Sequence, residues 1–105
     1  MILTPEQLLI QQTARRFAQE QVAPHAAEWE RQGAFRPGLF QELGALGLMG
    51  MTVPPEWGGA GADNVSYALA LQEIAAGDGA LATVVSGHNS VGVMPILSYG
   101  TEAQK

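Results

Sequence analysis

Residues 79–101 read GALATVVSGHNSVGVMPILSYGT and contain no formally charged side chain. A run this apolar is normally core or membrane, because a charge removed from water must be paired or neutralised. A cluster of small and hydrogen-bonding residues, 86–90, occupies its centre. We therefore expect a buried helix. Composition alone leaves open whether this helix is only tightly packed or also forms one wall of a ligand cavity.

Membrane insertion is the other interpretation of this run, which reaches the length of a spanning helix. His88, Asn89 and Pro95 lie in its interior, and neither basic residues nor an aromatic belt flank it. We expect a helix inside a soluble protein and predict no membrane partner.

Length and charge exclude further classes. At 105 residues the chain is one domain at most. The net charge is −5 and the five Lys and Arg residues form no patch, so we predict no nucleic-acid partner. Cysteine is absent, which excludes disulfides and thiolate metal sites and fits a reducing compartment. The N-terminus lacks the features of a signal peptide, and we expect a cytoplasmic protein.

Helix signals account for nearly the whole chain. Thr4, Pro5 and Gln7 form a capping box with proline at the first helical position, which predicts a helix ending near Val22. The further expected helices are 25–32 before Gly33, one from Pro37 to Gly47, one from Asp63 or Asn64 to Ala76, and one capped by Asp78 and running to Tyr99. No segment alternates as a strand does. The prediction is an all-α fold, an orthogonal bundle of about five helices.

The last residues carry a second helix-start signal. Gly100 breaks the preceding helix, and Thr101–Gln104 repeats the Thr-x-x-Gln capping box. A helix nucleus that does not propagate is unstable. We therefore expect one domain, residues 1–105, whose residues 101–105 begin a truncated helix of a longer protein.

The chemically interesting side chains do not form a catalytic or metal-binding set. Ser86 and Ser90 lie two residues either side of His88, which on a helix turns them away from it, and no ligand lies at helical spacing from His88. The glycine-rich loop, 57–61, lacks the strand and the Lys-Ser/Thr of a phosphate-binding loop and predicts a tight turn with positive φ. Glu73 is a candidate catalytic carboxylate, although a structural ion pair is the commoner use of such a residue.

The spacing of the long helix favours a cavity wall instead. One broad stripe of this helix comprises Ala80, Val84, Gly87, His88, Val91 and Met94. Gly87 leaves a dent in that stripe. The residues alone thus predict a helical domain with a candidate cavity wall.

An ordered series of short motifs runs along the whole chain. The motifs are Thr4-Pro5-Glu6-Gln7, Arg16-Phe17-Ala18, Val22-Ala23-Pro24, Leu43-Gly44, Leu46-Gly47-Leu48, Val53-Pro54-Pro55-Glu56, Gly58-Gly59-Ala60-Gly61, Glu73-Ile74-Ala75, His88-Asn89-Ser90, Met94-Pro95-Ile96-Leu97 and Tyr99-Gly100-Thr101-Glu102-Ala103-Gln104-Lys105. In this order and spacing, the chain resembles the N-terminal helical domain of the acyl-CoA dehydrogenase family.

The resemblance implies the first of three domains of a larger flavoenzyme. Members of that family bind FAD and oxidise an acyl-CoA thioester to a trans-2-enoyl-CoA, and the electrons pass to an electron-transfer flavoprotein. The glutamate base and nearly all flavin contacts belong to the later domains. No catalytic and no cofactor-binding residue is therefore expected here, and Glu73 does not match the base. Family members form tetramers, so the resemblance also implies a homo-oligomer.

The resemblance also assigns substrate contacts. The matching helix of the family lines the far end of the acyl-chain pocket, and by position Gly87, His88 and Val91 face the fatty-acyl tail. Two alternatives stay open. A related acyl-CoA oxidase or flavin monooxygenase would share this domain, and a stand-alone helical interaction module would use the apolar face to bind a partner.

Overall fold

Helices form the whole framework of the protein. The structure, a computed structural model, describes residues 2–105, and no strand occurs among them. The elements in order are α1 (Pro5–Phe17), a π-helical turn (Ala18–Val22), a 3-10 turn (Ala23–His25), α2 (Ala26–Gln32), α3 (Leu39–Ala45), a 3-10 turn (Pro55–Trp57), α4 (Asn64–Gly77), α5 (Gly79–Gly87), a second π-helical turn (His88–Gly92) and α6 (Val93–Tyr99). The all-α prediction is confirmed.

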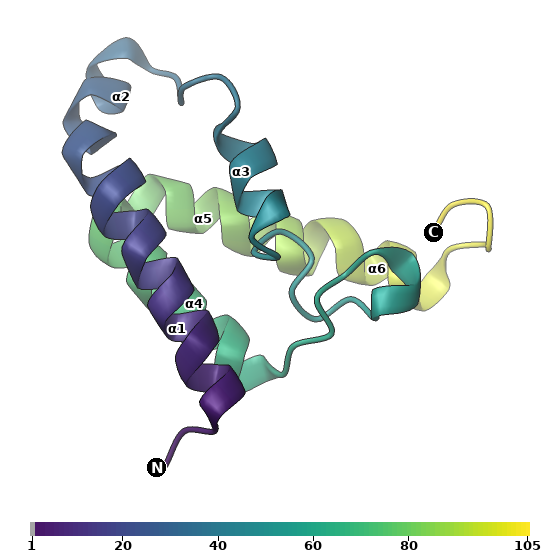
Figure 1. Cartoon of the computed structure of the whole chain (residues 1–105). Coiled ribbons are helices and arrows are strands. Elements are labelled where there is room, and N and C mark those ends of the chain that lie inside the picture. The colour runs from purple at the N-terminus through teal and green to yellow at the C-terminus, as the bar shows by residue number, and fades with distance from the viewer. Residues whose placement is uncertain (1) are drawn as a thin grey trace.

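Two of these helices continue through the π-helical turns: α1 runs into the turn Ala18–Val22, and α5 runs through the turn His88–Gly92 into α6. The segment from α5 to α6 is one long helix, Gly79–Tyr99, of 21 residues. α1 packs along α4, and α4 contacts α5. The long helix runs across α1 and α4, and α3 lies over its α5 half (Figure 1).

The helix ends follow the local signals. The Thr4 hydroxyl accepts the Gln7 backbone N–H and the Gln7 side chain accepts the Thr4 N–H, so the capping box is formed. Asp63 accepts the Ser66 N–H and caps α4, while Asp78 accepts the Ala80 N–H and caps α5. These predicted caps are confirmed, and they satisfy backbone donors that the first helical turn leaves without partners.

The start of α3 differs from the prediction. The helix expected from Pro37 begins at Leu39 instead. The reason is Gly38, whose φ of 83° is left-handed and therefore cannot belong to a right-handed helix. The predicted end is confirmed, because Gly47 has a φ of 80° and the Leu48 N–H bonds the Leu43 carbonyl.

The molecule is a thin plate that measures 40 × 35 × 19 Å along its principal axes. A helix with its side chains is about 10–12 Å across, so the plate is two helices thick and each helix can bury one face only. In the most apolar part of the long helix only 17% of the residues are buried. The expectation that this helix is buried is therefore wrong: Leu81 and Val85 face the core, whereas Val91 and Tyr99 are exposed.

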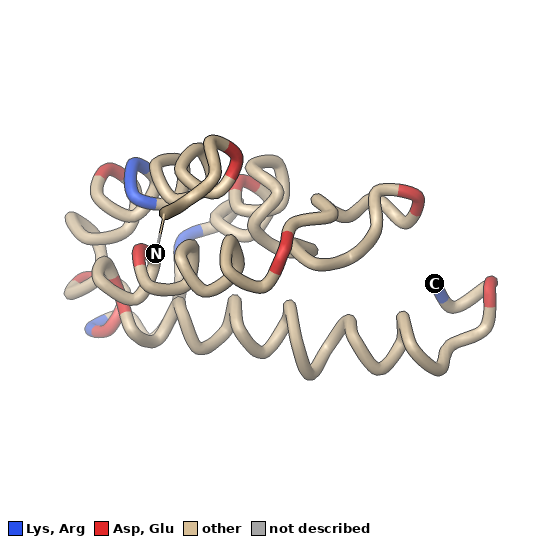
Figure 2. The backbone as a smooth tube through the Cα atoms, turned by 90° about the horizontal axis from the view of Figure 1, so that it is seen from below, with Lys and Arg blue, Asp and Glu red and all other residues tan. Residues whose placement is uncertain are grey.

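The same helix has the length and hydropathy of a membrane span, and Figure 2 shows it without an acidic or basic residue. One such helix is weak evidence of membrane insertion. Its inner face packs on the rest of the chain through Leu81 and Val85, which gives it a role in this fold.

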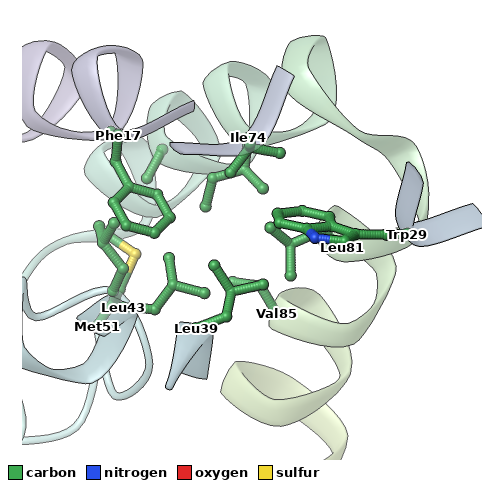
Figure 3. Close-up of a cluster of buried hydrophobic side chains, with 12 residues drawn as sticks. Phe17, Trp29, Leu39, Leu43, Met51, Ile74, Leu81 and Val85 are labelled. Carbon is green, nitrogen blue, oxygen red and sulfur yellow. The ribbon is translucent and has the colours of Figure 1, made fainter. Parts of the chain in front are cut away.

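One hydrophobic core holds the plate together (Figure 3). Its largest fully buried apolar side chains come from the first π-helical turn, α3, α4, α5 and the irregular segment after α3 (residues 46–54): Val22, Leu39, Leu43, Leu48, Met51, Ile74, Leu81 and Val85. Trp29, from α2, packs at the edge of the core with its ring edge-to-face against Phe35. Ala14 and Phe17 of α1 belong to the same core, which therefore joins the helices from α1 to α5.

The end of the chain forms the second capping box that the sequence predicts. The Thr101 N–H bonds the Gln104 side chain, and the Lys105 N–H reaches the Thr101 carbonyl at 3.1 Å. That last bond has the spacing of a first helical turn.

Leu43→Ala should lower the free energy of unfolding by about 2–5 kcal/mol, because Leu43 is fully buried and its loss leaves a cavity. Denaturant titration followed by circular dichroism measures this. Leu9→Ala is the matched control, since Leu9 is 63% exposed, and it should change stability by less than about 0.5 kcal/mol. Equal losses in the two variants would contradict the assignment of the core.

Acid should remove part of the stability through Asp63. The Ser66 backbone N–H, and then the Gln7 side chain, lower the pKa of Asp63 below its ordinary 3.8. A carboxyl with a lowered folded pKa stabilises the fold above its unfolded pKa, and this contribution is lost as the pH falls through the folded value. Unfolding midpoints recorded from about pH 7 down to about pH 2 should fall less steeply in Asp63→Asn than in the wild type. Parallel curves would show that Asp63 contributes nothing to acid sensitivity.

Candidate functional site

The centre of the long helix is hydrogen-bonded to the segment after α3 by one buried carboxamide side chain. Asn89 is 3% exposed, and its Oδ1 accepts the Met51 N–H at 2.8 Å. Its Nδ2 donates to the Leu48 carbonyl at 3.0 Å and to the Val85 carbonyl at 2.9 Å. Both donors and one acceptor of the side chain are thus used, and the segment after α3 is tied to the helix.

Asn89 lies within the second π-helical turn, where the backbone hydrogen bonds change register. The Val93 N–H bonds the His88 carbonyl, one residue farther than in an α-helix. Side chains complete the bonding of the neighbouring carbonyls: Asn89 bonds Val85, and the Ser90 hydroxyl donates to Ser86 at 2.6 Å. The wide turn is therefore held by its own polar side chains, which are Asn89 and Ser90.

A shallow groove of about 640 Å³ lies between α4 and α5. Gly87 and Val91 line it. A Cβ built on Gly87 would meet nothing within 4 Å, so the backbone there faces open space. The other lining residues are small or apolar for the most part: Leu71, Gln72, Ala75, Gly79, Ala82, Thr83, Ser86 and Ser90. The lining is therefore mostly apolar with a few hydrogen-bonding groups, a composition that small-molecule sites share.

A second hollow of about 240 Å³ lies between the segment after α3 and the α6 half of the long helix. His88 lines it together with Trp57 and Ile96. The structure therefore places the three predicted contact residues on two hollows: Gly87 and Val91 on the α4–α5 groove, and His88 on this one. His88 and Val91 are exposed, and Gly87 is half-buried.

The glycine-rich loop is a tight turn, as predicted. Gly58 and Gly61 have φ values of 86° and 63°. Gly59 is required for a different reason, since a Cβ on it would lie 2.1 Å from the Val53 carbonyl oxygen. The Gly61 N–H also bonds that oxygen, so the loop closes on itself rather than around a ligand.

The remaining candidate side chains have structural partners. Glu73 pairs with Arg15 of α1 at 2.8 Å, and this contact raises the pKa of Arg15. Ser86 accepts a bond from Tyr67 of α4, which joins the two helices beside the groove. Within residues 2–105 no cluster of three His, Asp or Glu side chains is arranged to hold a metal ion.

Sequence reasoning did not single out the residue that organises this region. Asn89 was one member of a polar cluster, and its contacts with Leu48 and Met51 span about forty positions of sequence. The available signal was that Asn89 stands alone as a carboxamide in a run without charges. Such a side chain is costly to bury unless every polar atom finds a partner.

Comparison with known proteins adds a separate line of evidence. The profile of the family described as "Acyl-CoA dehydrogenase, N-terminal domain" matches residues 4–105. The chain is 44% identical over 105 residues to an acyl-CoA dehydrogenase of Bacillus subtilis (strain 168), and the match covers 100% of this chain and 28% of that protein. The chain thus spans little more than a quarter of the length of this relative.

Two solved structures share the fold. One is described as the electron transferring flavoprotein of Acidaminococcus fermentans, with a TM-score of 0.92 and 33% identity, covering 99% of this chain and 27% of that one. The other is a glutaryl-CoA dehydrogenase from Mycobacterium smegmatis in complex with FADH2, with a TM-score of 0.91 and 34% identity, covering 98% of this chain and 26% of that one. The similarity extends over nearly all of this chain and a minor part of theirs.

Gly59→Ala should destabilise the protein by more than about 1 kcal/mol, because the added methyl group would collide with backbone that has no flexible end to move. Gly44→Ala is the matched control: its Cβ meets nothing within 4 Å and it lies inside α3. There the same change should stabilise by about 0.5–1 kcal/mol. Denaturant titration of both variants measures the difference, and the opposite order would refute this description of the loop.

Proposed function

The chain belongs to the acyl-CoA dehydrogenase family, and from that premise we propose that it is the N-terminal helical domain of an FAD-dependent enzyme that oxidises acyl-CoA thioesters. The domain comprises residues 1–105, and residues 101–105 begin the next helix of the parent enzyme. The observation that carries the proposal is the α4–α5 groove. Its lining is mostly apolar, and at Gly87 there is open space that an apolar tail could occupy.

In the proposed role, Gly87 and Val91 form the wall on which the end of the acyl chain lies. Val91 is 78% exposed in this chain, which is a costly state for a valine that nothing else covers. An acyl tail on one side and other parts of the enzyme on the other would remove this surface from water. His88 lies on the other hollow, so in this proposal it contacts the tail where the tail crosses the helix at Gly87. No side chain at position 87 blocks that path.

The chemistry itself is proposed to lie outside this chain. By the family resemblance the glutamate base belongs to a later domain, and Glu73, which forms an ion pair with Arg15 of α1, has a structural partner instead. Both hollows are lined mainly by apolar side chains. FAD, which supplies the hydride acceptor when bound, would be held by the remaining domains of the parent enzyme.

The partners follow from the same premise. We propose acyl-CoA as substrate, an electron-transfer flavoprotein as electron acceptor, and a homo-oligomeric parent enzyme. A neighbour in fold is described as an electron transferring flavoprotein, which supports a link to electron transfer, and another is described as bound to FADH2, which supports FAD as the cofactor of the parent enzyme. A cytoplasmic location remains our proposal, and the absence of cysteine is compatible with it.

The size of residue 87 should set the length of acyl chain that the parent enzyme accepts. Gly87→Phe fills the gap in the groove wall, so kcat/KM for long acyl-CoA should fall by about tenfold or more relative to short acyl-CoA. The measurement is kcat/KM across a series of acyl-CoA chain lengths.

Gly44→Phe is the matched control, because position 44 is exposed on α3 with nothing within 4 Å of its Cβ. It should leave the chain-length profile unchanged. A profile that Gly87→Phe also leaves unchanged would refute the assignment of the groove.

A further inference from the structure

The long helix has no clear inner and outer side by hydropathy. Its buried positions include Leu81 and Val85, and its exposed positions include Val84, 42% exposed, and Val91, 78% exposed. Rotating the helix about its axis would exchange one set of valines and leucines for a similar one. Apolar burial alone therefore discriminates poorly between rotational settings of this helix.

One polar residue does discriminate between them. Leu81, Val85 and Asn89 are four residues apart and share the inner face, and Asn89 alone among them must find specific partners. Those partners, the Met51 N–H and the Leu48 carbonyl, lie in residues that are 1% and 2% exposed. Any other rotation would leave these buried groups without hydrogen bonds, which is expensive.

The groove lies on the opposite side of the same turn. Gly87 and Val91 are each two residues from Asn89, which corresponds to about 200° of rotation on an α-helix and to somewhat less in the wider π-helical turn, so both lie about half a turn from it. When Asn89 points inward, Gly87 and Val91 must therefore point outward into the α4–α5 groove, which is where they lie.

We propose that Asn89 is a positioning residue that sets the rotation of the helix Gly79–Tyr99 and thereby directs Gly87 and Val91 into the groove. A single buried asparagine fixes register in the same way in coiled coils, where apolar residues alone allow several. The inference rests on the proposed function for the role of the groove, but its test does not, because it uses no substrate.

The absence of cysteine makes a direct test available. Single thiols are introduced by Val85→Cys on the inner face, Val91→Cys on the outer face, and Leu43→Cys in the core of α3. Each is placed in the wild-type background, in Asn89→Leu and in Asn89→Ser. The rate of alkylation of each thiol, at low protein concentration, reports how exposed that position is.

In the wild-type background the thiol at position 91 should react at least about tenfold faster than the thiol at position 85. Asn89→Leu keeps the volume of the side chain, and Asn89→Ser keeps a donor for the Val85 carbonyl but cannot reach the segment after α3. In both variants the ratio of the rate at position 91 to the rate at position 85 should fall by about tenfold, while the thiol at position 43 stays protected.

Ser90→Ala is the matched control. It removes a hydrogen bond from the same turn, but this bond stays within the helix, so the ratio of the two rates should not change. An unchanged ratio in both Asn89 variants would overturn the proposal. Loss of protection at position 43 as well would also overturn it, because the whole fold, rather than the rotation of one helix, would then depend on Asn89.

Discussion

The hydrogen bonds of Asn89 are the constraint on which the middle of the long helix and the candidate site around it depend. They join a helix that has no charge along its length to a segment that has no regular structure, and they do so inside the core. Each bond is worth little by itself, yet leaving its partners buried and unpaired costs the full desolvation of those groups. In the proposed account, the rotation of the helix between the two hollows follows from this one satisfied side chain.

The thinness of the molecule explains why the candidate site lies at its surface. A plate 19 Å thick has one core layer, so the outer face of every helix remains available for contacts. On the long helix that face is apolar and includes Val91 and Ile96. Apolar surface of this kind on an isolated domain marks contact with a ligand or with other protein. We interpret it as the surface that the acyl tail and the remaining domains cover in the parent enzyme.

Local features of the sequence predicted local features of the structure. The Thr4 and Asp78 caps, the turn at Gly58–Gly61 and the end of α3 at Gly47 all depend on a few neighbouring residues, and all are confirmed. The degree of burial of the long helix could not be predicted in this way, because it depends on how many layers pack against it. The π-helical turn at 88–92 was missed for a related reason: besides the bonds of Asn89 and Ser90 within the helix, it is held by the contacts of Asn89 with the distant residues Leu48 and Met51.

Hydrogen exchange at the Met51 amide tests the central claim most directly. This amide lies outside any helix, and its partner is the Asn89 side chain. If Asn89 holds the helix and the loop together, Met51 must exchange as slowly as the buried amides of α5, such as that of Val85. Exchange as fast as that of exposed Glu56, farther along the same segment, would show that the contact is not maintained in solution and would contradict the account.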